Sequence, residues 1–152
     1  MTVGLLIPLL CMMIEDFRHR TISIMFVLLF FVFSFGYSFY VYSWHIVLEN
    51  CMLNFLLLLY LHSCFTIYLF IRGKKNKALF EEYFGIGDAL YLCALTPMMS
   101  LKPYLLFLLL SMIMSLMWWL FKLKTGKKHT TIPFVGVSGF VLCGYLTIQL
   151  CQ

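Results

Sequence analysis

Two acidic residues stand at the ends of long apolar runs, where ionisable side chains are rare. Asp16 lies in IEDFRHR, directly after the first apolar run, and Asp88 lies in FGIGDAL, directly before a later one. Charged groups at or inside a membrane cost free energy, so they are functional candidates. Two carboxylates held close together share one proton, because both cannot ionise cheaply. The ionised member of such a pair activates water and the protonated member donates to a carbonyl, which is chemistry suited to peptide hydrolysis.

Glu15 is the alternative to Asp16 as the first member of the pair. Neighbouring residues on a helix point about 100° apart, so only one of the two faces Asp88. Sequence physics does not choose between them. Because two close carboxyls titrate jointly, the roles of acid and base are not assigned to single residues at this stage.

Gly85 and Gly87 precede the second acid in the motif GIGD. Glycine removes a side chain beside Asp88, so an extended substrate backbone or a partner helix comes close. An irregular helix start is tolerated where it lines a wet cavity, and its free N–H groups favour the charged form of an acid. We therefore expect both glycines to shape the site. The structural alternative is that Asp88 only caps a helix.

The elements that must position these residues are membrane helices. The chain has 152 residues, of which 63% are hydrophobic and 11% are charged, and its mean hydropathy is +0.97. A helix needs roughly 20 apolar residues to cross a bilayer. We expect an all-α integral membrane protein, with one peptidase domain over residues 1–152 that is a bundle of six transmembrane helices. The predicted spans are about 1–16, 24–43, 51–71, 84–100, 103–121 and 132–150.

The basic residues predict how this bundle lies in the membrane. Ten of the eleven lysines and arginines fall in the connections after spans one, three and five, and Lys102 alone falls on the other side. The positive-inside rule makes those connections cytoplasmic and places both termini outside. Asp16 and Asp88 then lie at similar depth on the cytoplasmic side. The net charge of +5 reflects this topology and contact with anionic membrane lipid, so no nucleic-acid partner is expected.

Other polar residues have structural explanations. The six cysteines form no CxxC pair and behave as small packing residues, so no metal site and no cofactor is expected. Small residues in spans five and six let helices approach closely: Ser111, Ser115, Gly136, Gly139 and Gly144. Helical spacing puts one polar face of span three toward the bundle interior: Asn54, His62 and Thr66. The loop at 72–83 is either a short amphipathic segment on the inner leaflet or a solvated connection.

Three motifs recur in the order and spacing of a known family. The first is Asp16-Phe17-Arg18-His19-Arg20-Thr21-Ile22, the second is Gly85-Ile86-Gly87-Asp88, and a weaker third is Thr131-Ile132-Pro133-Phe134. With these motifs the whole chain resembles the type IV prepilin peptidase family, the aspartic GxGD proteases of membranes. It departs from that family at Ser23 and Ile24, where proline and asparagine are usual.

The resemblance implies an activity and a place for it. Asp16 and Asp88 would be the catalytic pair, and Glu15 the lesser candidate. The family removes short basic leader peptides from prepilin-like or pseudopilin-like precursors of pili and secretion systems, at the cytoplasmic face of the inner membrane. Many bacterial members also methylate the new N-terminus with S-adenosylmethionine and carry an extra N-terminal region, often with paired cysteines. This chain shows neither the extra N-terminal region nor a CxxC pair, so a minimal form with peptidase activity alone is expected.

A different class of function is the alternative. A non-enzymatic transporter or assembly subunit would use the same two acids for ion contacts or helix packing. Small transporters more often carry repeats with broken helices near the bilayer midplane, whereas both acids here are predicted at one edge. The presenilin group, which shares GxGD, is disfavoured because Glu15 rather than tyrosine precedes Asp16.

Overall fold

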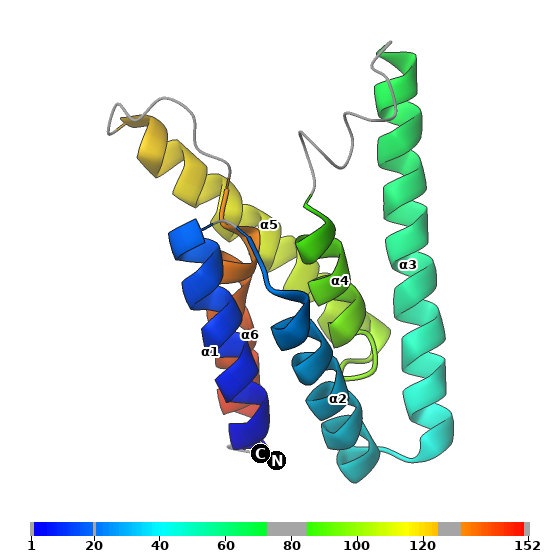
Figure 1. The fold of residues 1–152 in the computed structure, drawn as a ribbon. Coiled ribbons are helices and arrows are strands. Elements are labelled where there is room, and N and C mark those ends of the chain that lie inside the picture. Colours follow the sequence, from blue (N-terminus) through cyan, green and yellow to red (C-terminus); the bar gives the residue numbers. More distant parts are fainter. Residues whose placement is uncertain (1, 20, 73–84, 125–131, 151–152) are drawn as a thin grey trace.

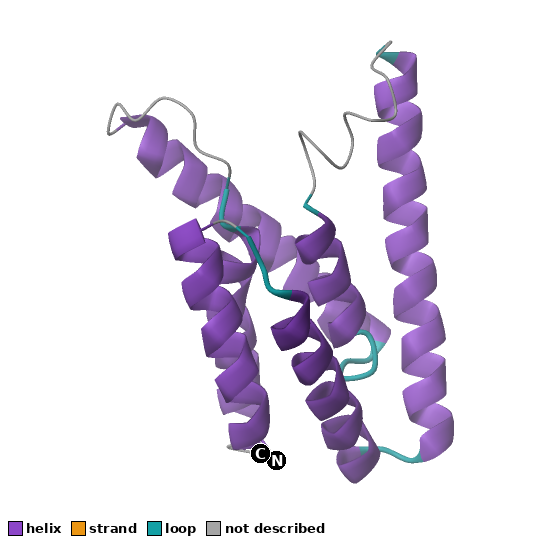
Figure 2. Ribbon diagram, in the orientation of Figure 1, coloured by secondary structure: helices purple, strands orange, loops and turns teal. Residues whose placement is uncertain are grey.

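A computed structural model describes residues 2–19, 21–72, 85–124 and 132–150. Within these ranges every regular element is a helix (Figure 2), which confirms the predicted all-α class. The helices are α1 (Thr2–His19), α2 (Ile24–Val41), α3 (Trp44–Ile71), α4 (Ile86–Leu95), α5 (Leu101–Lys124) and α6 (Phe134–Leu150).

Three of the described helices are long and apolar enough to cross a membrane: α2, α3 and α5. The helix α4 has 10 residues, which is about 15 Å of helix against the ~30 Å of a bilayer core. These three helices make the chain a membrane protein, whereas six spans with outward termini stay a prediction.

Two predicted boundaries are wrong. The segment 44–50 is the first part of the 28-residue helix α3 and not a loop, because Val47 and Asn50 in these turns are buried and pack the segment down. The predicted span at 84–100 ends at Leu95, and a turn over residues 96–100 leads into α5. Pro97 lies in that turn, where it provides no backbone N–H to continue α4.

The helix α4 lies in the interior of the bundle, with four of its ten residues buried. Figure 1 shows α1 and α6 side by side and α2 next to α4, while α5 passes behind them and α3 stands at one edge. On α1 the core residues Leu5, Leu9 and Met12 are fully buried, and their spacing puts them on one helix face. Tyr104 of α5 donates its hydroxyl to the Leu92 carbonyl at 3.0 Å, which joins α5 to α4.

The edge helix α3 is attached through Asn54. The side-chain amide of this fully buried residue donates to the carbonyls of Thr96 (3.0 Å) and Met99 (2.7 Å) in the turn after α4. The predicted inward polar face of α3 is therefore confirmed at Asn54, but His62 is exposed and Thr66 only half-buried, because α3 leans away beyond that anchor. An apolar cavity of about 650 Å³ lies there between α3, α4 and α5.

The small residues predicted for close packing divide into two groups. Ser111 and Ser115 are buried on α5, and Gly136 and Gly139 contact α1 closely, whereas Gly144 faces open space. The predicted amphipathic segment at 72–83 lies outside the described residues except for Arg72.

Candidate active site

Asp16 lies in the last turns of α1 with only 5% of its surface exposed. Its Oδ2 accepts a hydrogen bond of 2.6 Å from the backbone N–H of Gly136. Gly136 is in the first turn of α6, where backbone N–H groups have no partner within the helix; the first helical bond there is Val137 N–H to Pro133 O. A helix start carries partial positive charge, so this contact favours the carboxylate form of Asp16.

The close approach of α1 to α6 depends on two glycines. A Cβ on Gly136 would lie 2.8 Å from the Phe17 ring, and a Cβ on Gly139 would overlap the Met13 side chain. Met13 and Phe17 are four residues apart and therefore lie on the same face of α1. The missing side chains on α6 thus bring α1 near enough for Asp16 to reach the helix start.

Asp88 lies in the first turn of α4. The backbone of Gly85, at the N-cap position, forms a hydrogen bond with the Asp88 carboxyl, and the charges of Asp88 and Asp16 interact with each other. A Cβ on Gly85 would lie 3.2 Å from Asp88 Oδ2. The structure therefore brings together the two acids that the sequence separates by 72 positions.

A further contact of the site joins Gly87 to Ile22, which lies in the connection between α1 and α2. A Cβ on Gly87 would lie 3.1 Å from Ile22 Cδ1 and 3.2 Å from Ile22 Cβ. The space that this glycine leaves free is occupied by the chain's own Ile22. The end of the first motif and the middle of the second are thereby packed against each other.

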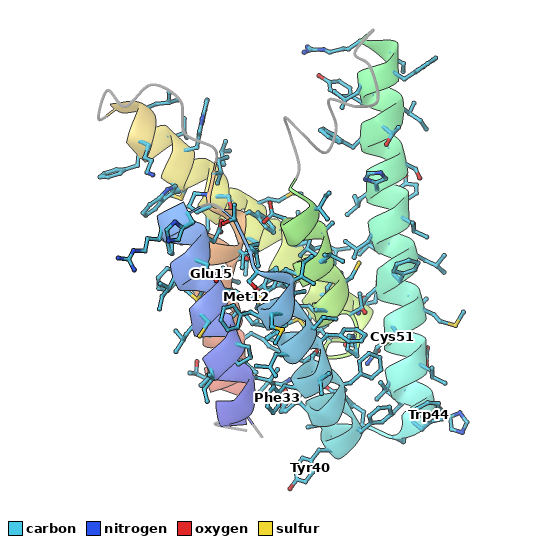
Figure 3. The ribbon with its side chains drawn as sticks, viewed as in Figure 1. Met12, Glu15, Phe33, Tyr40, Trp44 and Cys51 are labelled. Carbon is cyan, nitrogen blue, oxygen red and sulfur yellow. The ribbon has the colours of Figure 1, made fainter. Side chains whose placement is uncertain are left out.

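Glu15, the alternative to Asp16, has a different partner. Its Oε2 accepts a hydrogen bond of 2.9 Å from the backbone N–H of Ser23, which is the N-cap position of α2. Figure 3 shows Glu15 near the upper end of α1, about one turn beyond Met12. Glu15 therefore holds the start of α2, while Asp16 meets α6 and Asp88.

Sequence reasoning missed one partner of the pair, Gly136, and one buried residue that follows Asp88 on α4, Tyr91. Gly136 was expected to be a packing residue, and nothing in its spacing indicates that its N–H meets an acid 120 positions away. Tyr91 lies one turn after Asp88, is fully buried, and packs its ring 5.8 Å from that of Phe30. In the described ranges, no group of three or more His, Cys, Asp and Glu side chains is placed to hold a metal ion.

Comparison with known proteins places this geometry in a family. The sequence model of the type IV leader peptidase family matches residues 3–120, most of the chain, including both acids. No curated protein and no solved structure matches significantly. The membrane-capable helices and the two neighbouring carboxyls are consistent with this match. The chain belongs to the type IV leader peptidase family.

Proposed function

We propose that this protein is an aspartic endopeptidase of the inner membrane that removes short basic leader peptides from prepilin-like precursors at the cytoplasmic face. The observation that carries the proposal is the pairing of Asp16 with Asp88, from the end of α1 and the start of α4. Membership of the leader peptidase family supports peptidase activity. The precursors and the membrane lipid are the expected partners.

The placement of charge and aromatic side chains supports the cytoplasmic face. The ends of α1, α3 and α5 and the starts of α4 and α6 lie toward one end of the bundle (Figure 1). Arg72 lies over the Tyr68 ring and Lys122 over the Trp118 ring at that end, each at 5.3 Å. Tyr40 and Trp44 are exposed at the other end (Figure 3). Basic residues mark cytoplasmic ends and Trp and Tyr mark both interfaces.

The mechanism follows from a pair that shares one proton. The ionised carboxylate takes a proton from a water molecule, whose oxygen attacks the scissile carbonyl carbon. The protonated carboxyl donates its proton to the carbonyl oxygen, so the carbonyl becomes a tetrahedral diol. One carboxyl then donates its proton to the amide nitrogen, while the other carboxylate takes a proton from a hydroxyl of the diol. The C–N bond breaks, and the pair again holds one proton.

The glycines have distinct parts in this proposal. Gly85 carries no side chain beside the Asp88 carboxyl, which leaves the approach to that acid open to a substrate backbone. Gly87 shapes the site indirectly, since it seats Ile22. The apolar helix of the precursor stays in the bilayer while its basic leader reaches the two acids.

Cleavage of a co-expressed prepilin precursor, followed by the size shift of the product, tests the proposal. Asp16→Asn and Asp88→Asn each lower cleavage by about a thousandfold, since each removes a proton-transfer group. Glu15→Gln is the matched control, since it alters a neighbouring acid that bonds elsewhere. If both asparagine variants fold and still cleave at the wild-type rate, the two acids do not form a catalytic pair, and the non-enzymatic alternative gains support.

A further inference from the structure

We propose that the first turn of α6 is a positioning element of the active site, in which Gly136 holds Asp16 as the ionised member of the pair. The proposal rests on the proposed peptidase function and deepens it, since it assigns separate roles to the two acids. Asp16 then takes the proton from water, and the shared proton resides on Asp88. The matched family region ends at residue 120, so α6 lies beyond the part of the chain that the family comparison covers.

The hydrogen bond favours one charge state. The Gly136 N–H donates to Asp16 Oδ2 at 2.6 Å, and an N–H donor bonds more strongly to a carboxylate than to a neutral carboxyl. Asp16 is buried, so a carboxylate there needs a donor to replace water. The Gly136 N–H and the positive end of α6 supply that donor and an attractive field.

Asp88 is held in a different way. Its backbone partner is Gly85, the N-cap residue of its own helix, and its side chain is only half-buried. Asp16 instead contacts a separate helix whose position relative to α1 is fixed by packing. The position of Asp16 relative to Asp88 therefore depends on how closely α1 and α6 approach.

Phe17 fixes that approach. Its ring contacts Trp118 of α5 (5.7 Å between centroids) and Phe140 of α6 (6.2 Å), and three of its atoms would lie 2.8–3.0 Å from a Cβ at position 136. Phe17 is 38% exposed, but the neighbours of its ring on α5 and α6 oppose its movement on two sides. A methyl group at 136 therefore pushes α1 outward and carries Asp16 with it.

The interpretation of a pH experiment depends on which charged groups surround Asp16. Asp88 faces it from α4. On α1, Glu15 bonds to the Ser23 backbone, while Arg18 and His19 are exposed. On α5, Lys122 lies over the Trp118 ring. The first turn of α6, residues 134–137, carries no titratable side chain. A change at Gly136 thus alters the environment of Asp16 without adding or removing a charge.

The first experiment compares cleavage rates of four full-length proteins: wild type, Gly136→Ala, Phe17→Ala and the double variant Phe17→Ala/Gly136→Ala. We expect Gly136→Ala to slow cleavage by about 10- to 100-fold, the usual cost of misplacing a reacting group. Removing the Phe17 ring makes room for the methyl group, so the double variant recovers the rate of Phe17→Ala alone. Gly144→Ala is the control on the same helix, because a Cβ at 144 meets nothing within 4 Å.

The second experiment deletes the donor itself. Phe17→Ala/Gly136→Pro has no N–H at 136, and proline in a first helical turn removes no helical bond. Its ring Cδ takes the place of the amide hydrogen that bonds to Asp16 Oδ2, so the carboxylate loses this donor and also moves away from α6. Compared with Phe17→Ala/Gly136→Ala, we expect slower cleavage, and an acid limb of the pH–rate profile displaced to higher pH by about one unit, because the carboxylate has lost its donor.

Thermal unfolding in detergent shows which variants fold, and any folded variant decides the matter. The positioning role is overturned if folded Gly136→Ala cleaves at the wild-type rate. It is also overturned if folded Phe17→Ala/Gly136→Pro cleaves at the rate of Phe17→Ala/Gly136→Ala with an unmoved acid limb. For Phe17→Ala/Gly136→Pro, a loss of rate with an unmoved acid limb also overturns it, since that result indicates a structural effect alone. Wild-type cleavage with inactive Asp16→Asn leaves the proposed function intact in either case.

Discussion

Ile22 packs against Gly87, so that a Cβ at position 87 would lie 3.1 Å from Ile22 Cδ1. This contact joins the residues after Asp16 to the residue before Asp88. The position of one acid relative to the other therefore depends on it as well as on the approach of α1 to α6. Substitutions here test whether the two motifs act as one unit.

Enlarging residue 87 is expected to lower activity in proportion to the added volume. Gly87→Ala requires Ile22 to move by a few tenths of an ångström, including its Cβ and therefore its backbone, so cleavage falls by up to about tenfold. Gly87→Val adds two more carbon atoms. Overpacking of this kind lowers stability by about 1–3 kcal/mol, and cleavage falls further. Initial rates of precursor cleavage check the order.

The compensating variant is Ile22→Ala/Gly87→Ala, which removes the Ile22 Cδ1 and Cγ1 atoms that the methyl group meets and leaves the Ile22 Cβ. It is expected to cleave faster than Gly87→Ala. If Ile22→Ala fails to improve Gly87→Ala, the contact does not transmit the effect, and Gly87 acts on the substrate directly.

Cleavage is expected to rise and then fall as pH increases. At low pH both Asp16 and Asp88 are protonated and no carboxylate takes a proton from water; at high pH both are ionised and no acid donates to the carbonyl. The two limbs belong to the pair and not to single residues. Rates measured across pH in a detergent-solubilised assay give the bell-shaped curve.

Glu15→Gln is expected to leave both limbs of that curve in place, because Glu15 bonds to the Ser23 backbone and not to the pair. A displaced acid limb in this variant would show that Glu15 titrates together with Asp16 and Asp88, although its hydrogen-bond partner is a different one.

Asn54 is expected to be important for stability. Its amide joins α3 to the turn after α4 through two hydrogen bonds. Asn54→Leu leaves two buried carbonyls without that donor. Each unpaired carbonyl lowers the free energy of unfolding by at most about 1–3 kcal/mol. Thermal unfolding in detergent should show a lower midpoint.

Asn50 is a matched control for this prediction. It lies one turn earlier on α3 and is 5% exposed, but its Nδ2 has no hydrogen-bond partner among the described residues. Asn50→Leu is therefore expected to change the midpoint less than Asn54→Leu. Equal losses would indicate that α3 depends on general packing and not on the Asn54 amide.

The sequence predicted helices, and it predicted that Asp16 and Asp88 lie at one end, because apolar runs and basic residues are local signals. The choice between Glu15 and Asp16 depends on the helical phase of α1 against three other helices, which no local pattern contains. The bond between Asp16 and Gly136 spans 120 positions. The first turns of α3 were missed because WHIVLEN mixes polar and apolar residues and becomes helical through packing at Val47.

Three glycines of α6 provide a graded test of helix contact. Gly139→Ala meets the flexible Met13 side chain, Gly136→Ala meets the Phe17 ring, and Gly144→Ala meets nothing within 4 Å. Alanine is the better helix former by roughly 0.5–1 kcal/mol, so Gly144→Ala should raise the unfolding midpoint slightly. Gly139→Ala should lower the midpoint, because the buried Met13 side chain must move, and the extra variant Met13→Ala/Gly139→Ala should separate contact from propensity. Gly136→Ala should also lower the midpoint. A midpoint for Gly136→Ala above that of Gly144→Ala would mean that Phe17 moves aside and that α1 and α6 are not held at a fixed distance.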